Sequence, residues 1–168
     1  MTAADADPGS GPGAGPDRDS DRDPATAPAT DPVYPHWTEI PTRWADNDVY
    51  GHVNNTVHYA FMDTAINTWL VERGGLDFRD GPVVGLCVES SCVYTAEFAF
   101  PDVLAAGIRV GHLGNSSVRY EIGLYRSDRS TLVAEGRFAH VFCDRRTRRP
   151  VRIDGKLRAA LEELRRKP

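Results

Sequence analysis

The sequence lacks any long hydrophobic run. A membrane-spanning helix needs about eighteen or more consecutive apolar residues, and no stretch of the chain reaches that length. The first residues also lack a basic segment followed by an apolar one, so we expect no membrane span, no secretory signal and a cytoplasmic location. Cysteine is scarce as well. The spacings of Cys87, Cys92 and Cys143 match no metal-ligand pair, and their odd number fits reduced thiols.

Several motifs of common enzyme and binding classes are missing too. The chain has no glycine-rich phosphate loop and no nucleophilic serine elbow, which argues against P-loop nucleotide hydrolysis and against an α/β-hydrolase. It has no basic stretch alternating with aromatic residues, and its net charge is -4. These absences argue against nucleic-acid binding.

Charge and apolar residues are unevenly distributed along the chain. Residues 1–33 hold seven Asp and two Arg among Pro, Gly and Ala, with almost no large apolar side chain. Such a segment cannot bury enough surface to offset its ordering entropy, so we predict a disordered acidic tail. We expect residues 34–168 to form a single domain. Its end is basic, since residues 144–168 hold ten Arg plus Lys against four Asp plus Glu.

The domain contains one long helical pattern and several strand patterns. Asn54 is a good N-cap for a helix over residues 55–73, which is apolar over much of its circumference and ends at Gly74-Gly75. Alternation and β-branched or aromatic content predict strands over residues 36–44, 83–98, 104–113, 116–125 and 132–143, and a short amphipathic helix over 154–166. The pattern predicts an α+β fold. One long helix cannot cover both sheet faces, so we expect oligomerisation.

The polar loop before the long helix is the best candidate for chemistry. The first N–H groups of a helix are unpaired and lie at its positive end. Asp48 in this loop either bonds loop amides or acts as a nucleophile or general base, because a carboxylate can do each of these. We expect Asp46 to stabilise the loop or to face solvent.

The loop also carries a resemblance. The strings Arg43-Trp44-Ala45-Asp46-Asn47-Asp48 and Gly51-His52-Val53-Asn54-Asn55, followed by Tyr59 and Asp63, resemble hotdog-fold acyl-CoA thioesterases of the 4-hydroxybenzoyl-CoA thioesterase type. Residues 113–117 and 134–137 resemble later strand signatures of that family. The resemblance covers roughly residues 37–153. It implies a long central helix wrapped by a curved antiparallel sheet of about five strands. It also implies a homodimer or homotetramer with active sites at the dimer interface.

The resemblance assigns roles within the loop. Asp48 stands at the catalytic aspartate position, as nucleophile or as general base, and the backbone N–H of Asn55 would polarise the thioester carbonyl. Some relatives carry histidine where this chain has Asn55. The implied activity is acyl-CoA hydrolysis without a metal or redox cofactor. The alternatives are an acyl-ACP thioesterase and a non-catalytic acyl-thioester-binding protein, whereas the histidine-centred site of hotdog dehydratases is not evident.

Further residues are candidates for substrate binding, each with a plainer structural alternative. His52 contacts substrate or pins the loop, Asn54 contacts substrate or only caps the helix, and His58 lines the pocket or packs within the domain. Another branch of hotdog thioesterases has its catalytic carboxylate on the long helix, which in this chain carries Asp63. We expect Asp63 to pair with Asn67 four residues later and to shape the pocket or form a hydrogen bond there, rather than to act in catalysis.

Two serines and a basic segment complete the candidates. Ser116 and Ser117 would approach the thioester from the partner protomer, or they are ordinary strand serines near a turn. The basic segment of residues 145–149 would hold the phosphates of coenzyme A, or it is a solvated turn.

Overall fold

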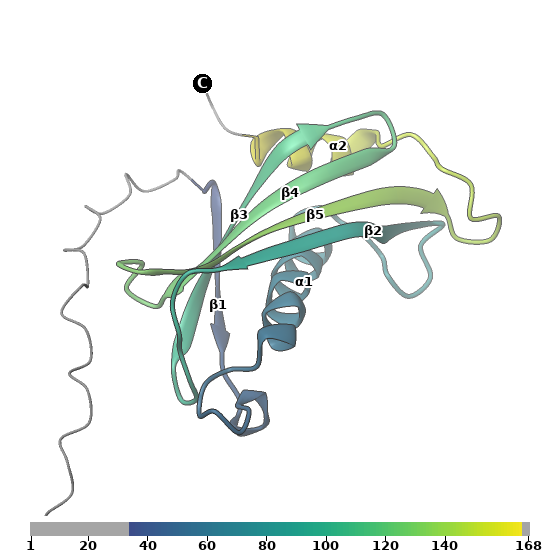
Figure 1. Cartoon of the computed structure of the whole chain (residues 1–168). Coiled ribbons are helices and arrows are strands. Elements are labelled where there is room, and N and C mark those ends of the chain that lie inside the picture. The colour runs from purple at the N-terminus through teal and green to yellow at the C-terminus, as the bar shows by residue number, and fades with distance from the viewer. Residues whose placement is uncertain (1–33, 166–168) are drawn as a thin grey trace, which may run out of the picture.

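The computed structural model describes residues 34–165, so the predicted disordered tail of residues 1–33 lies outside the described part. The elements follow in the expected order (Figure 1). They are β1 (His36–Pro41), the 3-10 turn η1 (Trp44–Asp46), α1 (Asn55–Glu72), β2 (Val83–Tyr94), β3 (Val103–Leu113), β4 (Ser117–Arg126), β5 (Leu132–Asp144) and α2 (Gly155–Glu163).

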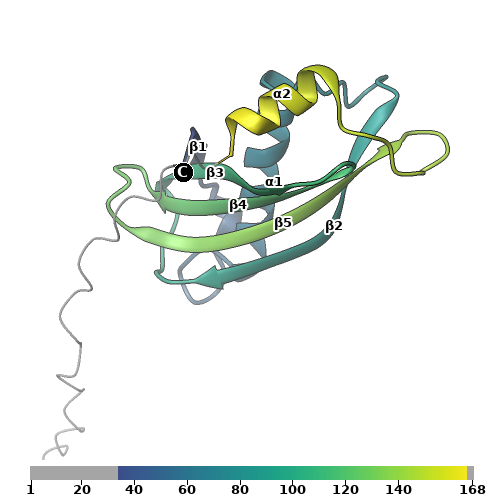
Figure 2. The same cartoon turned by 90° about the horizontal axis from the view of Figure 1, so that it is seen from above.

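The five strands form one antiparallel sheet in the order β1-β3-β4-β5-β2. The sheet is strongly curved, and α1 lies against its concave face (Figures 1 and 2). This confirms the prediction of a long helix wrapped by a curved antiparallel sheet. Among residues 34–165, no helix has both the length and the apolar character needed to cross a lipid bilayer.

The core forms where α1 meets the sheet. Met62, Ile66 and Leu70 are fully buried, together with inward-facing residues of β3, β4 and β5. Gly136 on β5 allows the helix to come close, because a side chain there would collide with Met62. The helix is therefore buried over much of its circumference, as its apolar pattern predicts.

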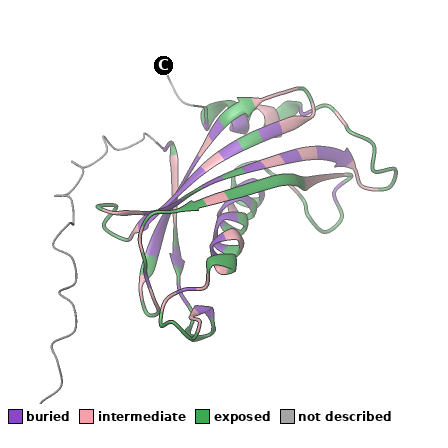
Figure 3. Ribbon diagram, in the orientation of Figure 1, coloured by how far each residue is buried: buried purple, intermediate pink, exposed green. Residues whose placement is uncertain are grey.

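One edge of the sheet is covered and the other is open. At the first edge, β1 pairs with β3 as far as Ile108 of β3. Further along β3, the Val110 N–H donates to the Leu164 carbonyl at 2.9 Å, so the end of α2 covers the rest of this strand's edge. On the other side the twelve-residue strand β2 is an open edge, mostly exposed (Figure 3), with Val88 63% exposed. One long, uncovered edge is available for pairing with another chain.

Some predicted boundaries were wrong at the ends that approach the polar loop. The first strand stops at Pro41 rather than residue 44, because Arg43 and Asp46 form a capped turn. The second strand stops at Tyr94 rather than residue 98. There the chain leaves the sheet, and the Phe98 carbonyl instead accepts a hydrogen bond from the Val53 N–H at 2.9 Å. Tertiary hydrogen bonds to the polar loop thus override the local strand pattern.

We expect Leu70→Ala to lower the free energy of unfolding by about 2–5 kcal/mol, because it leaves a cavity between α1 and the sheet. The neighbouring Val71 is 42% exposed, so Val71→Ala is the matched control and should change stability by about 0.5 kcal/mol or less. Urea denaturation of both variants measures the difference. Equal effects would contradict the placement of this helix face.

Candidate functional site

Asp46 holds the polar loop together. Its carboxylate is only 1% exposed and accepts hydrogen bonds from the Arg43 backbone N–H (2.6 Å), Nε (3.0 Å) and Nη2 (2.7 Å). Its carbonyl accepts the Asn54 N–H at 2.9 Å, which ties the turn to the start of α1. Burial by itself raises the pKa of Asp46, but the bonds and charge of Arg43 outweigh it and lower the pKa. Asp46 is therefore loop-stabilising, and the solvent-facing alternative was wrong.

Asp48 begins a tight turn beside the helix start. Its Oδ1 accepts the Tyr50 N–H at 2.9 Å, and its backbone pairs with His52 and Gly51. Gly51 has φ +90, a conformation that other residues rarely adopt. The Asp48 side chain remains 18% exposed, so it bonds a loop amide and is still accessible to a ligand.

His52 lies between two carboxylates. Its Nδ1 is 3.9 Å from Asp48 Oδ1, and its Nε2 is 3.8 Å from Oε1 of Glu97. Both distances are too long for hydrogen bonds, so His52 faces these groups without being fixed by them.

The N-terminus of α1 leaves one amide unpaired. Asn54 is the N-cap, as predicted, and its side chain accepts the Thr56 N–H at 3.0 Å. Its carbonyl accepts the Val57 N–H at 2.9 Å. Within residues 34–165 no acceptor takes the Asn55 N–H. This donor lies at the positive end of an eighteen-residue helix, where it favours negative charge.

Tyr94 fixes the helix start against the sheet. Its hydroxyl donates a hydrogen bond to the Asn55 carbonyl at 3.0 Å, so the end of β2 is bonded to the first turn of α1. Desolvation by burial is the main cause that raises the pKa of Tyr94, to about 12, so the phenol stays protonated as a donor.

Beside this helix start lies a cavity of about 300 Å³. The loop contributes Asp48 and His52, the helix contributes Asn55 and His58, and the segment after β2 contributes Glu97 and Phe98. A carboxylate, an unpaired amide and an apolar wall therefore border one space. Such a site can hold a carbonyl group next to a nucleophile or a base.

His58 forms part of the cavity wall as a neutral ring. It is 4% exposed, its Nδ1 lies 3.2 Å from the Asn54 carbonyl, and it meets the rings of Tyr94 and Phe98 edge-on at 4.9 and 5.1 Å. Burial lowers the pKa of His58 despite the opposing effect of its backbone hydrogen bonds. The alternative that His58 is a packed residue is thus correct, and the ring still lines the cavity.

The other predicted residues lie away from this cavity within one chain. Asp63 is exposed on α1, and Asn67 bonds its backbone carbonyl at 2.9 Å rather than its carboxylate, so the predicted side-chain pairing was wrong. Ser116 and Ser117 lie at the start of β4, where Ser117 is level with Val141 of β5. The cavity is at the opposite end of the sheet, near Tyr94.

Sequence reasoning missed the residues that close the cavity from the sheet side, which are Tyr94, Glu97 and Phe98. Their stretch has the composition of a strand, and it was predicted to continue as one. Only the contacts of Tyr94 with Asn55 and of Phe98 with Val53 reveal its role. No local signal in the sequence indicates these contacts.

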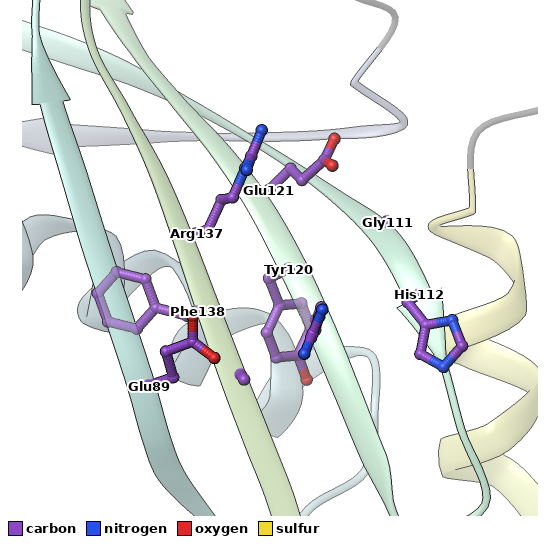
Figure 4. Close-up of a pocket in the computed structure, with 9 residues that line it drawn as sticks. Glu89, Gly111, His112, Tyr120, Glu121, Arg137 and Phe138 are labelled. Carbon is purple, nitrogen blue, oxygen red and sulfur yellow. The ribbon is translucent and has the colours of Figure 1, made fainter.

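A second cavity, of about 340 Å³, lies on the outer face of the sheet (Figure 4). Its polar lining mixes both charges, with Arg137 and Arg119 beside Glu89 and Glu121. It lies on the face away from α1 and contains none of the loop residues. The helix-start cavity is therefore the better candidate active site.

We expect Asp46→Asn to lower the free energy of unfolding at neutral pH by about 1–3 kcal/mol, because it removes the charged partner of Arg43 from a buried position. The folded-state pKa of Asp46 is lowered, so its contribution is present above the unfolded-state pKa and disappears as pH falls through the folded-state pKa. The difference in the free energy of unfolding between the variant and the wild type should therefore disappear at acidic pH. Urea titrations at several pH values measure this, and a gap that persists in acid would contradict it.

Comparisons with known proteins identify the family of the chain. A family model described as Thioesterase-like superfamily matches residues 42–161. The PA5185 protein from Pseudomonas aeruginosa strain PAO1 is 55% identical over 79% of this chain and 92% of that chain, with a TM-score of 0.77. Slr0204, a 1,4-dihydroxy-2-naphthoyl-CoA thioesterase from Synechocystis, is 17% identical over 76% and 96% of the two chains, with a TM-score of 0.68.

BH1999, a gentisyl-coenzyme A thioesterase, is 21% identical over 75% of this chain and 99% of that chain, with a TM-score of 0.67. At such identities these two likenesses show the fold alone. No curated protein matches the chain. The fold predicted by the resemblance is confirmed at the level of the superfamily, not of its 4-hydroxybenzoyl-CoA type. Because the family model matches most of the residues that the structure describes, the chain belongs to the thioesterase-like superfamily, with its hotdog fold and its general chemistry of thioester hydrolysis.

Proposed function

We propose that the protein hydrolyses an acyl-CoA thioester to a free acid and coenzyme A. The observation that carries this proposal is that Asp48 and Asn55, whose backbone N–H is unpaired, line the same cavity. Thioester hydrolysis needs a nucleophile or base on one side of the acyl carbon and a donor for the carbonyl oxygen on the other. The two groups meet both needs without a metal or a redox cofactor.

In this mechanism the thioester oxygen takes the hydrogen bond that Asn55 leaves open. Negative charge develops on that oxygen as the acyl carbon becomes tetrahedral. A fixed amide at a positive helix end stabilises the charge, and one such donor is worth roughly 10²–10³-fold in rate. The donor is a backbone group, so the Asn55 side chain is not needed for this step.

Asp48 acts in one of two ways. As a nucleophile it bonds to the acyl carbon, the carbon–sulfur bond breaks, and water then hydrolyses the mixed anhydride. As a general base it takes a proton from water while that water attacks the same carbon. In both routes coenzyme A leaves as a thiolate and is protonated.

The proposed assembly is a homodimer, or a tetramer of two dimers, with substrate sites at the dimer interface. The open β2 edge is where we expect two copies to pair. Antiparallel pairing about its midpoint brings the Val83 end of one chain beside the Tyr94 end of the other. The partner subunit's Ser116 and Ser117 would then approach the cavity from which the same residues of one chain are remote.

We expect Asp48→Asn to lower acyl-CoA hydrolysis by roughly 10²–10⁴-fold while leaving the melting temperature nearly unchanged. A thiol-release assay on a panel of acyl-CoA and acyl-ACP thioesters measures this. Asp63→Asn is the matched control, because this carboxylate is exposed on the same helix that begins at the site.

Three outcomes would overturn parts of the proposal. Activity that survives Asp48→Asn but disappears in Asp63→Asn would show that the catalytic carboxylate is Asp63 on α1. Turnover of acyl-ACP thioesters but not of acyl-CoA thioesters would show that the substrate is carried by acyl carrier protein. Tight acyl-thioester binding without turnover of any thioester would make the protein a binding module.

We expect Val88→Lys to shift the protein from dimer toward monomer. Val88 is 63% exposed at the middle of β2, so two introduced ammonium groups would face each other near the two-fold axis. Sedimentation analysis measures the shift, and circular dichroism confirms that the fold is kept. An unchanged dimer would place the interface elsewhere.

A further inference from the structure

The basic turn after β5 has a fixed shape. The Asp144 carboxylate accepts the backbone N–H groups of Arg146 at 3.1 Å and Thr147 at 2.7 Å, and the Asp144 carbonyl accepts the Arg148 N–H at 2.9 Å. These hydrogen bonds lower the pKa of Asp144, so its carboxylate stays ionised as the acceptor. The turn therefore holds its arginines in a defined arrangement.

One arginine anchors this turn and the others project from it. Arg145 points back into the protein, where its Nε and Nη2 donate to the carbonyls of Gly81 at 2.7 Å and Phe78 at 2.8 Å. Arg146, Arg148 and Arg149 are exposed. No ion pair joins these three side chains to a carboxylate within 4.0 Å in the part of the chain that the structure describes. Exposed guanidinium groups on a rigid turn can pair with phosphate in bidentate fashion.

This basic turn is remote from the cavity of its own chain. Val83 of β2 pairs with Asp144 at the turn, whereas Tyr94 at the other end of β2 touches the start of α1. The intervening strand is roughly 36 Å long at about 3.3 Å per residue. Figure 1 shows the turn and the helix start at opposite ends of the sheet. A ligand in the cavity would have to lie along the whole strand to reach the turn.

A second copy would remove this separation. In the proposed dimer, antiparallel pairing of two β2 edges would bring the basic turn of each chain toward the helix start of the other. The charges of the two ends are complementary, because the cavity end carries Asp48 and the 82% exposed Glu97. Opposite charges would therefore meet at both ends of the interface.

We propose that the partner subunit's Arg148 and the partner subunit's Arg149, aided by Arg146 of the same turn, bind the phosphates of coenzyme A whose thioester lies in the cavity of this chain. This inference rests on the proposed function and the proposed dimer. The phosphates stay remote from the acyl carbon throughout the reaction. Their contacts are equal in the ground and transition states, so they lower KM and leave kcat unchanged.

The first experiment compares two substrates that share one acyl group. In the double variant Arg148→Gln/Arg149→Gln, we expect KM for the acyl-CoA to rise about tenfold or more, with kcat nearly constant. Hydrolysis of the acyl-N-acetylcysteamine thioester, which lacks phosphates, should not change. The control is Arg119→Gln/Arg137→Gln, which removes two exposed arginines from the outer face of the sheet. An unchanged KM for acyl-CoA, or an equal loss on both substrates, would overturn the proposal.

The second experiment tests whether the turn acts across the interface. Differently tagged Asp48→Asn and Arg148→Gln/Arg149→Gln chains are co-expressed, and the mixed dimer is purified. Each mixed dimer contains one site with an intact Asp48 opposite an intact turn, so about half of the wild-type activity should return at low acyl-CoA. No recovery would show that the arginines serve their own chain. A monomeric wild type would also overturn the inference, whereas a wild type that hydrolyses neither thioester would instead refute the proposed function.

Discussion

The site depends on one buried carboxylate that is not itself proposed to react. The Asp46 carboxylate accepts hydrogen bonds from the backbone and the side chain of Arg43, and the Asp46 carbonyl accepts one from the Asn54 N–H. These bonds join the end of β1 to the start of α1. Asp48 and Asn55, whose N–H is unpaired, are thereby both held at the same cavity. Removing a buried acceptor that has several donors costs free energy of folding. Such an anchor suits a loop that must hold a hydrogen-bond donor and a carboxylate at fixed positions relative to each other.

The wrapped helix explains why the candidate site lies at an edge of the sheet. The curved sheet covers most of α1, and α2 covers the β3 edge beyond β1, so β2 is the long edge that remains open in the described structure. The segment after β2 closes the cavity through Phe98, and Tyr94 pins the helix start. The strand that forms the open edge thus also forms the cavity wall. Association through β2 would therefore enclose the site and add residues from a second chain.

The charges around the site suit a reaction that passes through an anion. The helix end is positive, and burial lowers the pKa of His58, so the proposed oxyanion is stabilised by the amide at the helix end rather than by a His58 imidazolium. The arginines stand apart at the other end of β2. In the proposed dimer this separates phosphate recognition from the chemistry, so affinity and turnover can be altered independently.

The sequence by itself determined the order of the elements and the N-cap at Asn54, and it indicated the loop as the candidate site. Three signals are local in the sequence: helical and strand periodicity, the capping residue, and the sequence motif shared with the family. They can therefore be recognised without the tertiary structure. Tertiary structure alone decided that Asp46 is buried, that the second strand ends at Tyr94, and that Glu97 and Phe98 border the cavity. It also separated Ser116 and Ser117 from Asp48 within one chain. These facts depend on contacts between segments distant in sequence, and residue spacing carries no information about such contacts.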